Sequence, residues 1–101
     1  MDTKEAKQLV AQLNYRGRKV EELEIYNFGE SAKVTFADNG KDKNVLLMTE
    51  VNGLSLSIGT KAKVERVSVI DINPMLGNFY CTIMFNNERT VRIMCKKVSV
   101  E

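Results

Sequence analysis

The sequence predicts an α+β fold in which an N-terminal helix packs on a strongly bent antiparallel sheet of about six strands. Three observations lead to this class: one helical period near the N-terminus, period-two alternation over most of the remaining chain, and turn residues between the alternating segments. The pattern leaves open whether the C-terminal half is barrel-like. A chain of 101 residues, 44% hydrophobic and 28% charged, fits a single globular domain covering residues 1–101.

Residues 3–14 have the apolar spacing of an amphipathic helix. The apolar positions recur at i, i+3, i+4 and i+7 and are Ala6, Leu9, Val10 and Leu13. Asp2 and Glu5 form a start that resembles a capping box, and Gly17 is expected to supply the left-handed stop. Because the apolar stripe is narrow, we expect this helix to cover a sheet rather than to stand alone.

The next two alternating segments, 22–27 and 32–36, predict a β-hairpin. A two-residue loop at 29–30 would pair Ile25 with Val34 and would place all the apolar side chains on one face. Residues 45–48 are apolar on both faces, which indicates a central strand. Asn52-Gly53 predicts a tight turn into a strand at 54–58, and a parity slip near Arg66 predicts a β-bulge.

The last hairpin is predicted at 79–85 and 89–95. The apolar positions of its two strands are Phe79, Cys81, Ile83, Phe85, Val91, Ile93 and Cys95. A three-residue loop at 86–88 places all of them on one face and pairs Cys81 with Ile93. The two cysteines are then diagonal neighbours roughly 7–8 Å apart. That separation exceeds the ~4.4–6.8 Å between α-carbons of a disulfide, so we expect two buried, reduced thiols.

The opposite face of this hairpin carries an aromatic ring, two thioethers and cations. We expect Tyr80 to stack on a base while Arg92 and Lys96 hold phosphates. Further cations for the same nucleic-acid or nucleoprotein ligand are Lys61, Lys63 and Arg66. The alternative is that the helix or another strand covers this face and leaves the cations at its rim.

A protein partner is the second predicted ligand. Met75 and Leu76 follow a proline in the predicted loop 73–78, and Met84 and Met94 lie on the hairpin face just described. Large apolar side chains in a loop are typical of a docking tip. They can also plug the open end of a sheet, and the sequence leaves both readings open.

A basic cluster follows the predicted helix and comprises Tyr15, Arg16, Arg18 and Lys19. It could contact phosphates together with Lys61, Lys63 and Arg66, or it could complement the helix dipole as solvated side chains. The net charge is +2, and the first fifty residues carry eight basic and nine acidic side chains against seven and four in the rest. This mild bias permits a polyanionic ligand without requiring one.

The residue types missing from the chain limit the possible chemistry. There is no histidine, and no nucleotide-binding, zinc or nucleophile motif is present. We therefore expect a non-catalytic protein without a metal or cofactor. No apolar run approaches the ~18 residues that span a bilayer, and the first residues do not resemble a signal peptide, so a cytoplasmic location is expected. The oligomeric state is left open, since edge strands can pair two copies.

The segment 59–101 has an order of elements found in small barrels: a basic strand, a long loop, the aromatic-led "FYCTIMF", a tight turn, the basic "RTVRIMC" and a closing "VSV". This order resembles the Tudor/KOW family. The resemblance implies a barrel that binds nucleic acid or peptide through aromatic residues at its rim, with Phe79 and Tyr80 at the matching positions. The chain lacks the family's Gly-rich turn and its cage of several aromatics, so methyl-lysine recognition is not implied.

Overall fold

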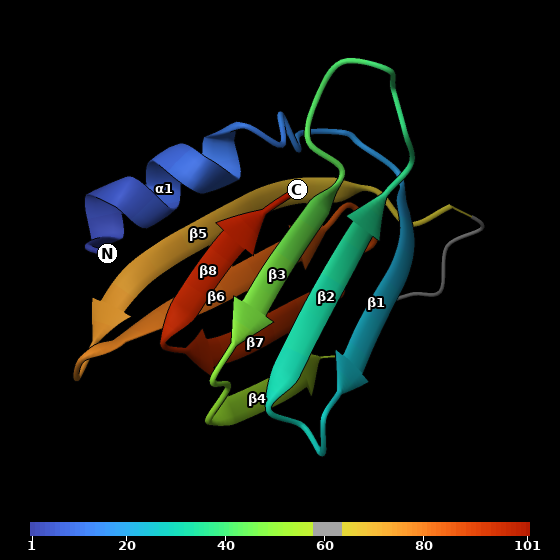
Figure 1. Ribbon diagram of the computed structural model, residues 1–101. Helices are drawn as coiled ribbons and strands as arrows, with labels where there is room; N and C mark the ends of the chain where they lie inside the picture. Colours follow the sequence, from blue (N-terminus) through green and yellow to red (C-terminus); the bar gives the residue numbers. More distant parts are fainter. Residues whose placement is uncertain (58–63) are drawn as a thin grey trace.

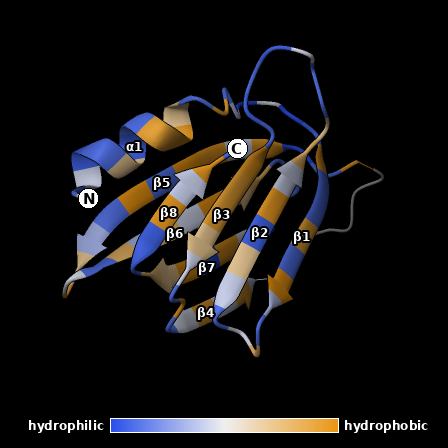
Figure 2. Cartoon of the chain, in the orientation of Figure 1, coloured by the Kyte–Doolittle hydropathy of each residue, from blue (hydrophilic) through white to orange (hydrophobic). Residues whose placement is uncertain are grey.

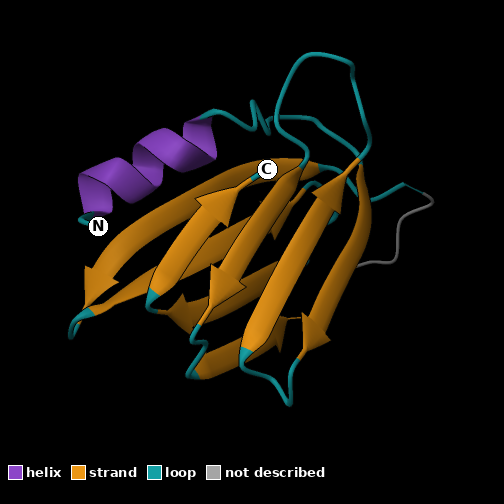
Figure 3. Cartoon of the chain, in the orientation of Figure 1, coloured by secondary structure: helices purple, strands orange, loops and turns teal. Residues whose placement is uncertain are grey.

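The structure, a computed structural model, describes residues 1–57 and 64–101 and contains one helix and eight strands in these ranges (Figure 1). The elements are α1 (Thr3–Ala11), β1 (Val20–Tyr26), β2 (Ser31–Phe36), β3 (Val45–Thr49), β4 (Gly53–Ser57), β5 (Val67–Met75), β6 (Asn78–Phe85), β7 (Thr90–Cys95) and β8 (Lys97–Val100). The strands form two four-stranded antiparallel sheets, ordered β1-β2-β3-β8 and β4-β7-β6-β5. Figure 3 shows how strands dominate the described chain.

The predicted fold class is wrong. The strands form two sheets rather than one bent sheet of about six, the fold is mostly β rather than α+β, and neither sheet closes into a barrel. The barrel-like C-terminal half that the resemblance implied is therefore absent from the described residues. The error arises because alternation along the chain shows that strands exist, whereas the sheet that each strand joins depends on partners far away in the sequence.

The chain passes from one sheet to the other at two places that lie against each other. Residues 50–52 connect β3 to β4, and Lys96 connects β7 to β8. The Asn52 amide donates to the carbonyl of Met94 at 2.8 Å, and the Lys96 amide donates to the carbonyl of Thr49 at 3.3 Å. The tight turn predicted at Asn52-Gly53 is therefore wrong, and the chain instead crosses between sheets with Glu50 in the left-handed region (φ 52°).

Helix α1 closes the side of the sandwich where β5 and β8 lie (Figure 1). Ala6, Val10 and Leu13 are buried in the common core, as the apolar spacing predicts. The Asp2 carboxylate accepts a hydrogen bond from the Glu5 amide at 2.8 Å, which confirms the predicted N-terminal cap. The helix ends at Ala11, three residues earlier than predicted, and Asn14 (φ 47°) is the first left-handed residue after it.

The inner faces of the two sheets form the core. Figure 2 shows β3 as hydrophobic along most of its length and β1 as alternating. β3 is central in its sheet, as predicted, but only Leu46 and Met48 on its inner face are buried, while Val45 and Leu47 are half-buried. Its outer face is therefore not covered by a second layer.

The first hairpin has the predicted faces but a different register. Ile25 pairs with Ala32 instead of Val34, because the loop spans residues 27–30 rather than two residues. Asn27, Phe28 and Gly29 all have positive φ, which lengthens the turn. Since the shift is an even number of residues, every side chain keeps its face.

The β5–β6 hairpin contains the bulge that the parity slip predicts. The register of β5 against β6 shifts between Val67 and Val69. At the other end the two strands run up to a two-residue turn at Leu76-Gly77, where both residues have positive φ. The loop predicted at 73–78 is therefore mostly strand.

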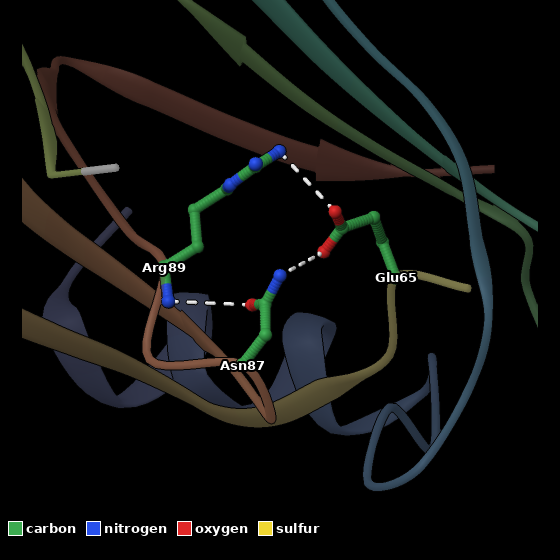
Figure 4. A network of polar contacts seen from close by, with 3 residues as sticks. All are labelled: Glu65, Asn87 and Arg89. Atoms are coloured by element: carbon green, nitrogen blue, oxygen red, sulfur yellow. Dashed lines mark hydrogen bonds and ion pairs between the residues drawn. The ribbon is translucent and has the colours of Figure 1, made fainter. Parts of the chain in front are cut away.

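The last hairpin has the predicted register. Phe79 pairs with Cys95, Cys81 with Ile93 and Ile83 with Val91. Its turn is fixed by a polar network in which Asn87 donates to Glu65 at 2.9 Å and Arg89 forms an ion pair with Glu65 at 3.2 Å (Figure 4). Glu88 (φ 68°), and not an asparagine, takes the left-handed position.

The two cysteines are free and buried, as the register predicts. A hydrogen bond with the Cys95 thiol, together with burial, raises the pKa of the Cys81 thiol. The native state therefore keeps this proton at pH values where an unfolded thiol, with a pKa of about 8.5, has lost it.

We expect neither thiol to react with Ellman's reagent in the native protein and both to react in denaturant. Above about pH 8.5 the Cys81 thiol binds fewer protons in the unfolded chain than in the native one, so its contribution should make the free energy of unfolding fall as the pH rises, by at most ~1.4 kcal/mol per pH unit. Urea titrations followed by circular dichroism between neutral and alkaline pH measure this decline. Rapid labelling of Cys81 under native conditions would contradict its burial.

Candidate binding surfaces

The side of the β4-β7-β6-β5 sheet that points away from the core is called the outer face here. Cross-strand pairing arranges its residues in three rows: Gly53, Met94, Tyr80, Asn73; Ser55, Arg92, Thr82, Asp71; and Ser57, Thr90, Met84, Val69. Tyr80, Arg92, Met84 and Met94 thus share one surface, as the predicted register requires.

The alternative that the helix covers this surface is wrong. Helix α1 packs against β5 and β8, at the side of the sandwich, and not over β6 and β7. Met84 is 43% exposed, and Tyr80 and Arg92 are half-buried between their neighbours in the sheet. Met94 lies over Gly53, where an added Cβ would stand 3.3 Å from the Met94 Cβ and Cε atoms.

The outer face is nearly neutral. Of the twelve residues in these three rows only Arg92 and Asp71 are charged, and they lie in the same row. Arg92 makes no ion pair or hydrogen bond with the residues that the structure describes. A surface of this composition offers few contacts to a phosphate backbone, whereas tyrosine, methionine and arginine are the residue types enriched in protein interfaces.

Two of the cations predicted to join this face, Lys96 and Arg66, lie far from each other. Lys96 is exposed at the corner between β7 and β8, whereas Arg66 precedes β5 at the opposite end of the sheet. Lys61 and Lys63 lie outside the described residues. Of the predicted nucleic-acid set, the described residues Lys96 and Arg66 are therefore not brought together, and the part played by Lys61 and Lys63 stays a prediction.

Arg66 belongs instead to a groove of about 480 Å³, called the basic groove here. Its charged lining residues are Arg16, Arg18, Lys19, Lys41, Arg66 and one carboxylate, Asp38. Hydrogen bonds between the chain before β1 and the chain before β5 build it. The Gly17 amide donates to the carbonyl of Val67 at 2.7 Å, and Lys19 and Arg66 form a β-bridge. Two basic segments far apart in the sequence are thereby placed side by side.

Arg18 is the structural centre of the groove. Its guanidinium donates to the carbonyls of Leu13, Lys43 and Ala37 at 2.7, 2.7 and 2.6 Å, and to the Asn44 side chain at 2.8 Å. It also lies 5.0 Å from the centroid of the Phe36 ring. Four acceptors occupy this side chain, so Arg18 holds the groove together and is not free to bind a ligand.

The loop after β2 brings Lys41 to the groove. Asn39 accepts hydrogen bonds from the amides of Lys41 and Asp42 and donates to the Asp42 carboxylate at 2.7 Å. The Gly40 amide, first among several groups, lowers the pKa of the Asp38 carboxyl. The carboxylates of this loop are therefore engaged with the loop's own amides, and the Lys41 ammonium stays available.

Four cations of the basic groove have no carboxylate partner among the described residues: Arg16, Lys19, Lys41 and Arg66. The ion pairs found in the described chain are Lys33–Glu24, Arg89–Glu65 and Lys97–Glu50, all elsewhere. Arg66 donates to the Gly17 carbonyl at 2.8 Å. The sequence pointed to the cluster at 16–19 and to Arg66, but Lys41 carried no signal because it reaches the groove only through the β2–β3 connection.

The residues predicted to dock a protein lie at two places. Met75 and Leu76 are at the β5–β6 turn, where Leu76 is 96% exposed, so the alternative that they plug the end of the sheet is wrong. Met84 and Met94 are on the outer face. Within the described residues no group of three or more potential metal-binding side chains of the His, Cys, Asp or Glu types occurs, and no helix there is long and apolar enough to cross a membrane.

Comparison with known proteins identifies a similar fold but gives no information on function. No family model and no curated protein matches the chain. The fold is similar to the crystal structure of an uncharacterized protein from Neisseria gonorrhoeae, with a TM-score of 0.62 and 10% sequence identity. The match covers 86% of this chain and 92% of that one. At this identity the likeness shows a shared fold alone.

Proposed function

We propose that the protein is a non-catalytic module that binds the phosphate backbone of a single-stranded nucleic acid in the basic groove. The observation that carries the proposal is the gathering of Arg16, Lys19, Lys41 and Arg66 in one groove without carboxylate partners. Cations in this arrangement retain their full attraction for phosphate, and the release of condensed counterions favours binding.

The shape of the groove favours one strand over a duplex. A volume of about 480 Å³ suits a short stretch of backbone. The single described helix packs its apolar face on the core, so this arrangement does not present it as a recognition helix for a major groove. None of the described residues that line the groove is aromatic, so they offer no stacking for the bases and binding is expected to depend little on sequence.

Charge reversal in the groove tests the proposal. We expect the double variant Arg16→Glu/Lys19→Glu to bind a labelled single-stranded oligonucleotide of about ten nucleotides at least tenfold more weakly, with a shallower dependence of affinity on salt. Fluorescence anisotropy at roughly 50 to 200 mM salt measures both quantities. Both residues are exposed, so circular dichroism should show an unchanged fold.

The matched control is Lys4→Glu/Lys7→Glu, which changes the net charge equally on exposed positions of α1. It should leave the affinity within about twofold, since long-range charge effects are screened beyond ~10 Å. Equal losses in both double variants would mean that net charge and not the groove determines binding. A loss in Arg92→Glu with none in the groove variant would place the ligand on the outer face instead.

The neutral outer face favours a second candidate function, which is the binding of a protein partner. Tyr80, Met84, Arg92 and Met94 form an uncovered surface of the residue types that dominate interface energetics. A partner held there by apolar contact would stay bound to the immobilised chain at high salt, whereas a ligand in the basic groove would be released. Salt dependence therefore separates the two functions.

A further inference from the structure

The four edges of the two sheets are protected to different degrees. An open edge offers unpaired amides and carbonyls to any other strand, and proteins usually block such edges with charges, bulges, proline or a covering element. Helix α1 packs against β5 and β8, and the Tyr15 hydroxyl donates to the Ile70 carbonyl on β5. β1 carries Glu21, Glu22 and Glu24 and an irregular register at its start.

Within the part of the chain that the structure describes, β4 has none of these protections. Its sequence Gly53–Ser57 reads GLSLS, without a charge or a proline, and its register against β7 is unbroken. Among the described strands it pairs only with β7. Leu54 and Leu56 pair with the buried Ile93 and Val91 and so share their face of the sheet, yet they are 45% and 56% exposed. The edge therefore combines backbone groups that no described strand pairs with and apolar side chains that are not fully covered.

We propose that β4 pairs antiparallel with β4 of a second copy of this chain. A two-fold axis through Ser55 sets Ser55 opposite its own copy, Leu54 opposite Leu56 and Gly53 opposite Ser57. Every pair then matches in face: leucine meets leucine on the inner side, and small residues meet on the outer side. The β4-β7-β6-β5 sheets of the two copies then become one continuous eight-stranded sheet.

Charge favours a second copy over a foreign strand as the occupant. In an isologous contact the same strand of both copies meets, so an edge rich in charges of one sign, such as β1, would repel itself. An uncharged edge carries no such penalty. The strand is five residues long and the contact is small, below the ~1,200 Å² of stable complexes, so the association is expected to be weak and dependent on concentration.

Cysteine cross-linking tests both the contact and its register. The native Cys81 and Cys95 are buried and do not interfere. In Ser55→Cys the new thiols lie opposite each other at the Cα separation of a cross-strand pair, ~4.5–5.5 Å, within the range for a disulfide. In Ser57→Cys they lie four residues apart along the strands, roughly 14 Å. We expect oxidation to produce a covalent dimer from the first variant and little or none from the second.

Association in solution provides the independent measurement. Sedimentation of the unmodified chain should show a monomer–dimer equilibrium over concentrations up to about 1 mM. Leu54→Lys/Leu56→Lys, which adds charge to exposed edge positions, should abolish it, whereas Met84→Lys on the outer face should not. Equal cross-linking of both cysteine variants would indicate random collision and refute the register. A chain that stays monomeric throughout would refute self-pairing and leave β4 for a strand of another protein.

Discussion

Replacement of Ile83 by alanine is expected to lower the free energy of unfolding by about 2–5 kcal/mol, the range for truncating a large apolar side chain in a core. Ile83 is fully buried in β6, paired with Ile70 on one side and with Val91 on the other. The loss combines the transfer of the missing methyl groups with the cavity that they leave. Because the chain has no tryptophan, urea unfolding is best followed by far-UV circular dichroism.

Met84→Ala is the matched control, since the two residues are neighbours on one strand and point to opposite faces. Met84 is 43% exposed on the outer face, so its truncation should cost less than about 1 kcal/mol. The ratio of the two losses reports directly which face of β6 lies in the core. Similar losses in both variants would mean that the outer face is covered by another part of the chain or by a second molecule.

Replacement of Arg18 by methionine is expected to lower the free energy of unfolding by about 3 kcal/mol. Methionine keeps much of the aliphatic length over Phe36 but removes donors to three carbonyls and one side-chain amide oxygen. Hydrogen bonds from a charged donor contribute about 1.5–3 kcal/mol each in separate measurements, and they do not add when one side chain makes all four. Because Arg18 is partly exposed to solvent, we expect the total loss in the free energy of unfolding to lie near the lower end of what its four hydrogen bonds could contribute.

Two further variants show what Arg18 contributes. Arg16→Met, two residues away and exposed, should change the stability by no more than about 0.5 kcal/mol. Arg18→Lys should recover only part of the loss, because a single ammonium cannot reach acceptors spread around a planar guanidinium. If Arg18→Lys were as stable as the natural chain, charge alone would suffice and the fork of hydrogen bonds would be unimportant. Urea titration of Arg18→Met, Arg18→Lys and Arg16→Met under one set of conditions measures these differences in the free energy of unfolding.

The last hairpin shows how far local sequence reasoning reaches. The apolar positions of residues 79–85 and 90–95 share a face only in one register, and the structure has that register. The same reasoning failed for the sheet as a whole, because Asn52-Gly53 looks like a tight turn but the chain crosses there between sheets. The crossing at residues 50–52 is stabilised by the second crossing between the sheets at Lys96, more than forty residues later. No residue next to Asn52-Gly53 in the sequence indicates that the chain changes sheet there.

The candidate site was predictable to a similar extent. Alternation predicted that Tyr80, Arg92, Met84 and Met94 share a face, and the structure places them together. Their predicted union with Lys96 and Arg66 fails because these two cations lie at opposite ends of the sheet. The basic groove, by contrast, combines residues 16–19 with Lys41 and Arg66, and local spacing cannot anticipate that combination.

The sequence by itself determined the strands, the face that each side chain takes, the capped N-terminal helix and the reduced state expected for the buried thiols. These features follow from backbone geometry over a few residues, where a period of two or 3.6 decides direction. Tertiary structure alone decided that there are two sheets, that no described element covers the outer face or the β4 edge, and that four cations meet in one groove. Those outcomes depend on contacts between residues far apart in the chain. Which of these contacts form is determined by the packing of the whole core.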